Sequence, residues 1–341
     1  METDALLASI RDGTLTRDTA QTLSLEQLIA RNAAGTTALH AAAKYGRLRD
    51  LSLDLIQADY LLLRNDSGYT PLHQAAYSGH LRQLPPHLLS RENFLARSNA
   101  GYTVLHIAAS SGTLDQLPEG LLDAELLLLR TDIGNTLLHE AAENGALDRL
   151  PATFLTETLL TARNLSGETV LHVAALNGHL DQVPAALLTA KILLLKTKNG
   201  DTVLHAAAIA GHLAQIPADL LVRENLIISS KNGYTVIHAA AETGQLDKIP
   251  ANQLTADLLL TRNDHGDTPL HAAACEGHLN QIPLWLLTTE LLAVRNYDGG
   301  TPLMASVGSG HEEQIPLKLR PKPPGPLKRL LVKLGMSRPR F

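Results

Sequence analysis

The sequence has little cysteine, few aromatic residues and no long hydrophobic run. Cys275 is the single cysteine among 341 residues, so no disulfide can form within the chain, and we expect a cytoplasmic protein. Aromatic residues are only 3%, so the 45% that are hydrophobic must build the core mainly from Leu, Ala, Ile and Val. No apolar run approaches the roughly 18 residues that span a bilayer. Residues 1–13 lack the basic start of a secretory signal, so we expect a soluble chain.

Recognisable catalytic motifs are missing as well. The sequence has no phosphate-binding loop, no G-x-G-x-x-G after a strand, no H-E-x-x-H and no cysteine pair. Cys275 stands beside Glu276 with no basic neighbour, whereas an activated thiol needs an electropositive setting. We therefore expect no enzymatic activity, no cofactor, no metal and no small-molecule substrate.

Charge is distributed unevenly along the chain. Residues 317–341 contain eight basic side chains and no acidic one, whereas the remaining residues hold 21 basic against 34 acidic side chains, a net charge of −13. An acidic body makes nucleic acid an unlikely partner, because binding to phosphates needs a basic surface. The basic tail is a separate feature.

A repeat of 33 residues runs through the chain without insertion. Histidine recurs at His40, His73, His106, His139, His172, His205, His238 and His271. Threonine precedes each histidine by three places, and glycine follows it by six, as in Thr268 and Gly277 around His271. Residues 1–34 form a first, capping repeat with Asp4 in the threonine column. Residues 299–316 form a tenth repeat, in which Met304 replaces the histidine.

Each column has a physical role in a short helix. Thr268 is placed to accept a hydrogen bond from a free backbone N–H of the first turn, and Pro269 then stands at the first helical position, where its missing N–H costs nothing. Ala273 and Ala274 allow a neighbouring helix to approach closely. Gly277 suits the left-handed conformation that ends a helix. The threonine column therefore predicts the start of a helix in every repeat.

The pattern T-P-L-H-x-A-A-x-x-G-H-L resembles the ankyrin repeat, most closely in residues 70–81 and 268–279. The period of 33 residues is also that of the ankyrin family. The resemblance covers about residues 2–316. It implies an all-α, ankyrin-like solenoid of about ten stacked repeats, a protein–protein interaction scaffold whose partner binds the inner, concave face, and a structural role for the histidines.

The histidine column has a metal-binding and a structural interpretation. Zinc needs ligands about 2 Å away around one point, whereas stacked repeats lie about 10 Å apart, so histidines along a stack cannot share an ion. The structural interpretation, which we favour, is that each imidazole bonds to the capping threonine and to the backbone of the next repeat.

A column of prolines departs from the usual ankyrin pattern. It comprises Pro85, Pro118, Pro151, Pro184, Pro217, Pro250, Pro283 and Pro316. Proline inside a helix costs about 3 kcal/mol or more, so the second helix of each repeat should be split here. We expect a turn to end before each proline, and the proline to open a new turn at its first position. Thr255 and Ser90 then precede further apolar runs, as N-caps do.

Variable positions before the threonine and after the alanine pair predict the partner-facing surface. They hold five of the seven tyrosines and a group of acidic and amide residues, namely Tyr45, Tyr69, Tyr77, Tyr102, Tyr234, Glu140, Glu143, Asn144, Glu168 and Asp201. Exposed tyrosines commonly anchor protein interfaces. The alternative is that these columns vary freely and only keep the protein soluble. We predict a groove with an aromatic N-terminal part and an acidic middle.

The segment 317–341 combines a Pro-rich linker with one amphipathic stretch. In residues 326–335 the spacing places Leu327, Leu330, Leu331 and Leu334 on one helical face. Such a helix can fold back and cap the last repeat, or tether the protein to an anionic membrane or an acidic partner. We favour capping.

Overall fold

The computed structural model describes residues 2–320, so the predicted amphipathic helix at 326–335 lies outside the described residues. The chain divides into two compact units, residues 1–192 and 193–341, called the N-terminal unit and the C-terminal unit below. Both are helical. Three isolated bridges, such as Arg97–Thr103, are the only β-type pairings of residues 2–320, which confirms the all-α prediction.

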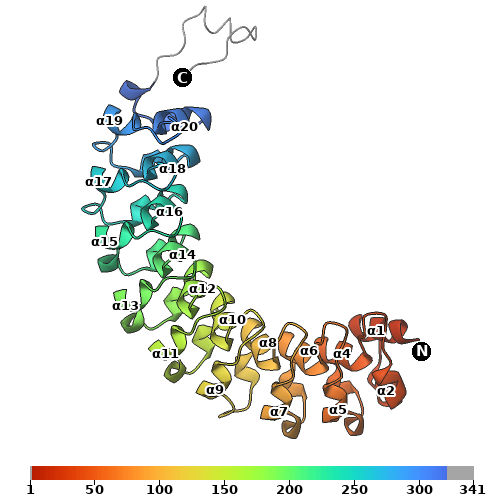
Figure 1. Ribbon diagram of the computed structural model, residues 1–341. Helices are drawn as coiled ribbons and strands as arrows, with labels where there is room; N and C mark the ends of the chain where they lie inside the picture. The colour runs from red at the N-terminus through yellow and green to blue at the C-terminus, as the bar shows by residue number, and fades with distance from the viewer. Residues whose placement is uncertain (1, 321–341) are drawn as a thin grey trace, which may run out of the picture. The chain divides into compact units, whose positions relative to one another are not determined.

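Each repeat begins with one α-helix of about two turns, and these helices lie side by side in each unit (Figure 1). In the N-terminal unit they are α1 (Thr3–Arg11), α4 (Ala38–Lys44), α6 (Pro71–Tyr77), α8 (Val104–Ser110), α10 (Leu137–Glu143) and α12 (Val170–Asn177). In the C-terminal unit they are α14 (Val203–Ile209), α16 (Val236–Glu242), α18 (Pro269–Glu276) and α20 (Pro302–Gly308).

A second row of one-turn helices ends the first nine repeats (Figure 1). It comprises α2 (Arg17–Gln21), α3 (Leu25–Ile29), α5 (Ala58–Leu61), α7 (Arg91–Phe94), α9 (Ala124–Leu127), α11 (Glu157–Leu160), α13 (Ala190–Leu193), α15 (Arg223–Leu226), α17 (Ala256–Leu259) and α19 (Thr289–Leu292).

Short 3₁₀ turns connect the two rows. They are η1 (Leu48–Asp50), η2 (Leu53–Leu55), η3 (Leu81–Gln83), η4 (Pro86–Leu88), η5 (Leu114–Gln116), η6 (Leu147–Arg149), η7 (Ala152–Phe154), η8 (Leu180–Gln182), η9 (Ala185–Leu187), η10 (Leu213–Gln215), η11 (Ala218–Leu220), η12 (Leu246–Lys248), η13 (Leu279–Gln281), η14 (Glu312–Gln314) and η15 (Leu317–Leu319).

The core lies between successive first helices and is made of leucine and alanine. In α6, the side chains of Leu72, Ala75 and Ala76 are completely buried. α6 packs against α4 on one side and α8 on the other, and α16 packs in the same way against α14 and α18. The small side chains of the alanine pairs allow this close approach, so the core can be close-packed with few aromatic residues.

The threonine column caps the first helices as predicted. The Oγ1 of Thr70 accepts from the His73 backbone N–H at 3.4 Å, and Gly277 ends α18 with a φ of 78°. The first repeat differs, because α1 begins at Thr3 with Glu2 before it, and Asp4 lies inside the first turn instead of capping it. The tenth repeat keeps its cap, since Thr301 accepts from the N–H of Met304.

The prolines divide the second half of each repeat, as expected, but not at the expected position. Pro184 has a φ of −53° and a ψ of 126°, so it is extended and precedes η9 as its N-cap. Its carbonyl accepts from the Leu187 N–H at 2.8 Å. We predicted the first helical position. Because both positions tolerate a residue without N–H, the missing donor could not distinguish them.

A glutamine two places before the proline holds neighbouring repeats together. The Oε1 of Gln116 accepts from the Leu81 N–H at 3.0 Å, and its Nε2 donates to the Gly79 carbonyl at 2.7 Å. Gln281 makes the same pair of bonds in the C-terminal unit, at 2.9 and 2.6 Å. The side chain thus satisfies the free N–H at the start of a 3₁₀ turn and a loop carbonyl of the preceding repeat.

Candidate functional site

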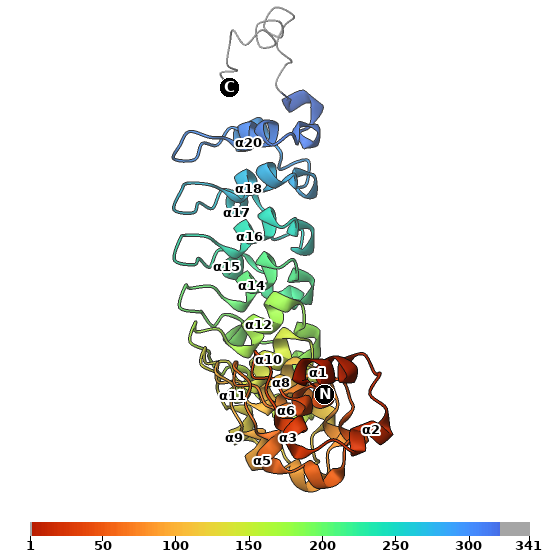
Figure 2. The same cartoon turned by 90° about the vertical axis from the view of Figure 1, so that its right-hand side faces the viewer.

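Several of the predicted site residues lie on the hairpin loops between repeats. These loops project to one side of the helices (Figure 2). The Oδ1 of Asn65 accepts from the N–H groups of Ser67 and Tyr69, a side-chain-closed turn that asparagine favours. Gly68 adopts a φ of 78° there. The Asp66 N–H then donates to the carbonyl of Ala34 in the preceding hairpin, at 3.2 Å. Successive hairpins are therefore tied together through the backbone.

The histidine rings hold these hairpins in place by hydrogen bonds. The Nδ1 of His73 accepts from the Thr70 N–H at 3.1 Å, so the ring proton is on Nε2, which donates to the Tyr102 carbonyl of the next hairpin at 3.1 Å. Burial lowers the pKa of His73, His106 and His139 to about 4, so they are neutral near pH 7. These bonds confirm the predicted contacts of the column.

Two of the predicted tyrosines lie against this histidine row in the N-terminal unit. The rings of Tyr69 and His73 meet edge to face at 5.5 Å, and those of Tyr102 and His106 at 6.1 Å. Both tyrosines are half-buried. Partial burial raises the pKa of Tyr102, and the carboxylates of Glu140 and Glu143 raise it further. The aromatic and acidic groups predicted from the sequence are thus electrostatic neighbours.

Tyr45 and Tyr77 are the more exposed members of the set. Tyr77 ends α6 with 61% of its side chain exposed, and Tyr45 follows α4 with 38% exposed. Tyr45 also lines a hollow of about 380 Å³, together with Asp4, Gln74 and residues of α1 and α4. These two rings present apolar area that no neighbouring repeat covers.

Glu140 departs from the prediction, because its side chain is buried rather than available at the surface. It is 3% exposed, and its Oε1 accepts from the Nδ2 of Asn135 at 3.0 Å. Burial raises the pKa of its carboxyl to about 7. Glu143 and Asn144 are exposed, and half-buried Glu168 accepts from Asn164 at 2.7 Å. The exposed negative charge of this region thus belongs to Glu143.

Exposed apolar residues at two hairpin tips were not among the predicted residues. Ile133 and Leu165 are 56% and 62% exposed, and the Leu165 N–H donates to the Ile133 carbonyl at 3.0 Å. The 33-residue register offered the clue, because the other tips of the N-terminal unit hold Asp, Asn, Ser or Ala at these positions. Leu176, at the end of α12, is a further exposed apolar residue of this unit.

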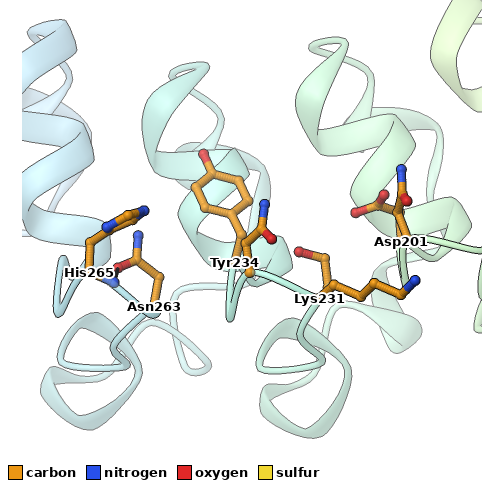
Figure 3. A pocket seen from close by; sticks show the side chains of 8 residues that line it. Asp201, Lys231, Tyr234, Asn263 and His265 are labelled. Atoms are coloured by element: carbon orange, nitrogen blue, oxygen red, sulfur yellow. Dashed lines mark hydrogen bonds between the residues drawn. The ribbon is translucent and has the colours of Figure 1, made fainter.

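Asp201 and Tyr234 line one pocket of the C-terminal unit, with a volume of about 540 Å³ between successive hairpins. Figure 3 shows Lys231 extending from its hairpin toward the one that carries Asp201, with His265 on the opposite wall. Lys231 and His265 were missed by the sequence prediction, which considered the residue just before each threonine but not the hairpin tips. The pocket offers both charges and several amides, a setting for polar groups of a ligand.

Tyr234 also borders a second hollow of about 510 Å³ along α16, α18 and α20. Its hydroxyl donates to the carboxylate of Glu242, and partial burial together with this bond raises its pKa. Cys275 lies in the same hollow and is exposed, with its sulfur 3.6 Å from the Ser309 hydroxyl. Tyr234 is therefore shared by two adjoining hollows of one unit.

The predicted residues thus fall into two groups. Eight belong to the N-terminal unit, and Asp201 and Tyr234 belong to the C-terminal unit. Residues 2–320 bring no three His, Cys, Asp or Glu side chains together in a way that could hold a metal ion. They also form no helix long and apolar enough to cross a membrane. The assignment of these residues to partner binding stays a prediction.

Comparison with protein families agrees with the repeat geometry. Residues 171–251 match the family model "Ankyrin repeats (3 copies)", and residues 265–290 match "Ankyrin repeat". No curated protein matches the sequence closely enough for a narrower assignment. Ankyrin repeats are generally protein–protein interaction modules and typically have no enzymatic activity. Residues 171–251 and 265–290 are therefore identified as ankyrin repeats, and the same period, capping threonines and histidine bonds extend on both sides of them.

Proposed function

We propose that this protein is a non-enzymatic scaffold whose partner protein docks on the hairpins and first helices of the N-terminal unit. We call this surface, with Tyr45, Tyr69, Tyr77, Tyr102 and Glu143 as its main groups, the tyrosine face. The observation that carries the proposal is the proximity of Tyr102 to Tyr69, Glu140 and Glu143, which joins the aromatic and acidic residues in one region.

The tyrosines supply the anchoring part of this surface. A tyrosine ring is large and rigid and has a polar tip, so it buries area at little entropic cost. Tyr69 and Tyr102 are already held by their histidine neighbours, and Tyr45 and Tyr77 leave most area for a partner. Binding of a folded partner would cover Tyr45 and Tyr77 first.

Exposed carboxylates select the kind of partner. Glu143 is exposed, and Glu168 is half-buried at the next hairpin. Such charges act mainly on association rate and specificity. The partner should therefore present basic residues beside an apolar contact surface, where the tips of Ile133 and Leu165 add further apolar area.

A double substitution tests the tyrosine face. Tyr45→Ala with Tyr77→Ala should leave the fold intact, because both rings are exposed, and weaken binding of the natural partner at least tenfold, about 1.4 kcal/mol. Glu143→Gln should reduce the salt dependence of the association rate. Binding is measured by titration with the partner purified on the intact chain.

Leu128→Ala is the matched control. Leu128 follows α9 in the second row of helices and is 38% exposed, the same fraction as Tyr45. The Leu128→Ala substitution removes exposed apolar area from the second row of helices, outside the tyrosine face. Equal affinities of the double variant, the control and the unmodified protein would refute docking on the tyrosine face.

A further inference from the structure

An exposed apolar cluster lies in the C-terminal unit, in the last two repeats of the described chain. It consists of Leu284, Trp285 and Leu317, which are 76%, 69% and 81% exposed, and we call it the tryptophan patch. Leu284 and Leu317 each follow a proline of the repeated column, exactly one repeat apart. Trp285 is the single tryptophan of the sequence.

The register shows how unusual this cluster is. The residues at the Leu284 position of earlier repeats are Pro86, Glu119, Ala152, Ala185, Ala218 and Ala251, and those at the Trp285 position are His87, Gly120, Thr153, Ala186, Asp219 and Asn252. Small or polar residues suit a position that faces water. Apart from Leu53 in the second repeat, which has no proline before it, large apolar residues appear there only in the last two repeats. Contiguous exposed apolar side chains usually mark a surface that something covers.

We propose that residues 326–335 fold as an amphipathic helix and cover the tryptophan patch. The leucine face formed by Leu327, Leu330, Leu331 and Leu334 matches the patch in chemistry. The chain also leaves from the right place, because the guanidinium of Arg320 donates to the Ile315 carbonyl at 2.8 Å and fixes the exit beside Leu317.

The connecting segment is long enough for this return. Seven residue steps separate Arg320 from Leu327, which allows at most about 25 Å when fully extended. Neighbouring repeats lie about 10 Å apart, so the leucines can reach both Leu317 and the Trp285 position. A short tether also gives an effective concentration in the millimolar range, which favours this segment over a partner in solution.

Charges around the patch suit the same occupant. Glu290, Glu312 and Glu313 are exposed on the last two repeats, and Lys318, next to Leu317, is exposed as well. The amphipathic segment carries Lys328, Arg329 and Lys333 and no acid. A basic helix laid across acidic repeats places opposite charges at the rim of an apolar contact, and an arginine or lysine beside an indole adds a favourable contact of its own.

Fluorescence of the single tryptophan tests the proposal in the full-length protein. Acrylamide quenching is compared for the unmodified chain, Leu330→Asp and Val332→Asp. Val332 lies on the opposite side of the predicted helix, so its substitution adds the same charge without touching the leucine face. Leu330→Asp should raise the quenching constant about twofold, because uncovering restores solvent access to a large ring. Val332→Asp should leave the constant unchanged, and far-ultraviolet circular dichroism should report the same helix content for all three.

Other occupants give different outcomes. Equal quenching in all three proteins would overturn the proposal. Protection of Trp285 that disappears on dilution would assign the patch to a second copy of the chain, and so would overturn it too. Protection that appears only with phosphatidylcholine–phosphatidylserine vesicles would assign it to an anionic membrane. None of these readouts depends on the partner of the tyrosine face.

Discussion

Acid should unfold this protein through its histidine column. His73, His106 and His139 are 1% exposed or less, and burial lowers their pKa from 6.5 to about 4. The unfolded chain therefore binds three protons between these values that the folded chain does not. Because the free energy of unfolding decreases as the pH is lowered wherever the unfolded state binds more protons, it should fall below about pH 6.5 and level off near pH 4.

The magnitude follows from the two pKa values. Between about pH 7.5 and pH 4.5, each of the three histidines contributes a loss of about 2 to 3 kcal/mol. Glu140 acts in the opposite sense, because its folded pKa of about 7 lies above the unfolded value of 4.5, so protonation of the buried carboxyl stabilises the fold as pH falls. This stabilisation offsets the loss of free energy from about one histidine. A net loss of about 5 kcal/mol remains, a large part of the stability of an ordinary domain.

Urea unfolding followed by far-ultraviolet circular dichroism at a series of pH values measures this dependence. His139→Gln removes one titrating ring and should reduce the slope by about 1.4 kcal/mol per pH unit in the middle of the range. His87→Gln is the control, because His87 is exposed in η4 and is not a member of the column. Glu140→Gln should make the acid loss larger. A free energy that stays constant from about pH 7 to pH 4.5 would refute the argument.

Two further predictions concern the backbone. Gly101→Ala should destabilise the protein more than Gly310→Ala. Both glycines have a positive φ, which alone costs an alanine about 1 to 2 kcal/mol. Only at Gly101 would the new Cβ also meet a backbone atom, the Asp132 nitrogen at 2.8 Å. Thermal unfolding of the two variants checks the order, and equal losses would contradict it. Pro250→Ala should change the free energy of unfolding by no more than about 1 kcal/mol, because Pro250 lies outside any helix; a much larger loss would show that the ring itself packs the fold.

The sequence was sufficient where the determinants are local. A threonine cap, a glycine with positive φ and a proline without N–H act within a few residues, and each recurs every 33 residues, so their effect could be predicted for all repeats together. The prediction that failed, Pro184 at the first helical position, concerns ψ of the proline itself. That angle is set by the residue at which the next 3₁₀ turn begins, Ala185 and not Pro184, and the residue types did not indicate this start.

The candidate site was harder to predict because exposure depends on neighbouring repeats. Glu140 and Glu143 lie three residues apart in α10, and both occupy variable columns. Glu140 is buried against Asn135 of the hairpin, whereas Glu143, the last residue of the helix, is exposed. The periodicity of the sequence identifies the face of a helix on which a residue lies. How deeply its side chain is buried depends on which side chain of an adjacent loop packs against it.

The hairpins explain how one scaffold can carry different binding chemistry along its length. Their turns are closed by an asparagine, threonine or serine side chain, and backbone N–H to carbonyl bonds join successive hairpins, as from Lys231 to Asn199 at 2.8 Å. The side chains at the tips are not needed for these bonds. A tip can therefore hold Asp66, Ile133 or Lys231 without altering the backbone bonds between hairpins. The tip residues are thus the positions that can change to suit a partner with the least effect on the stability of the fold.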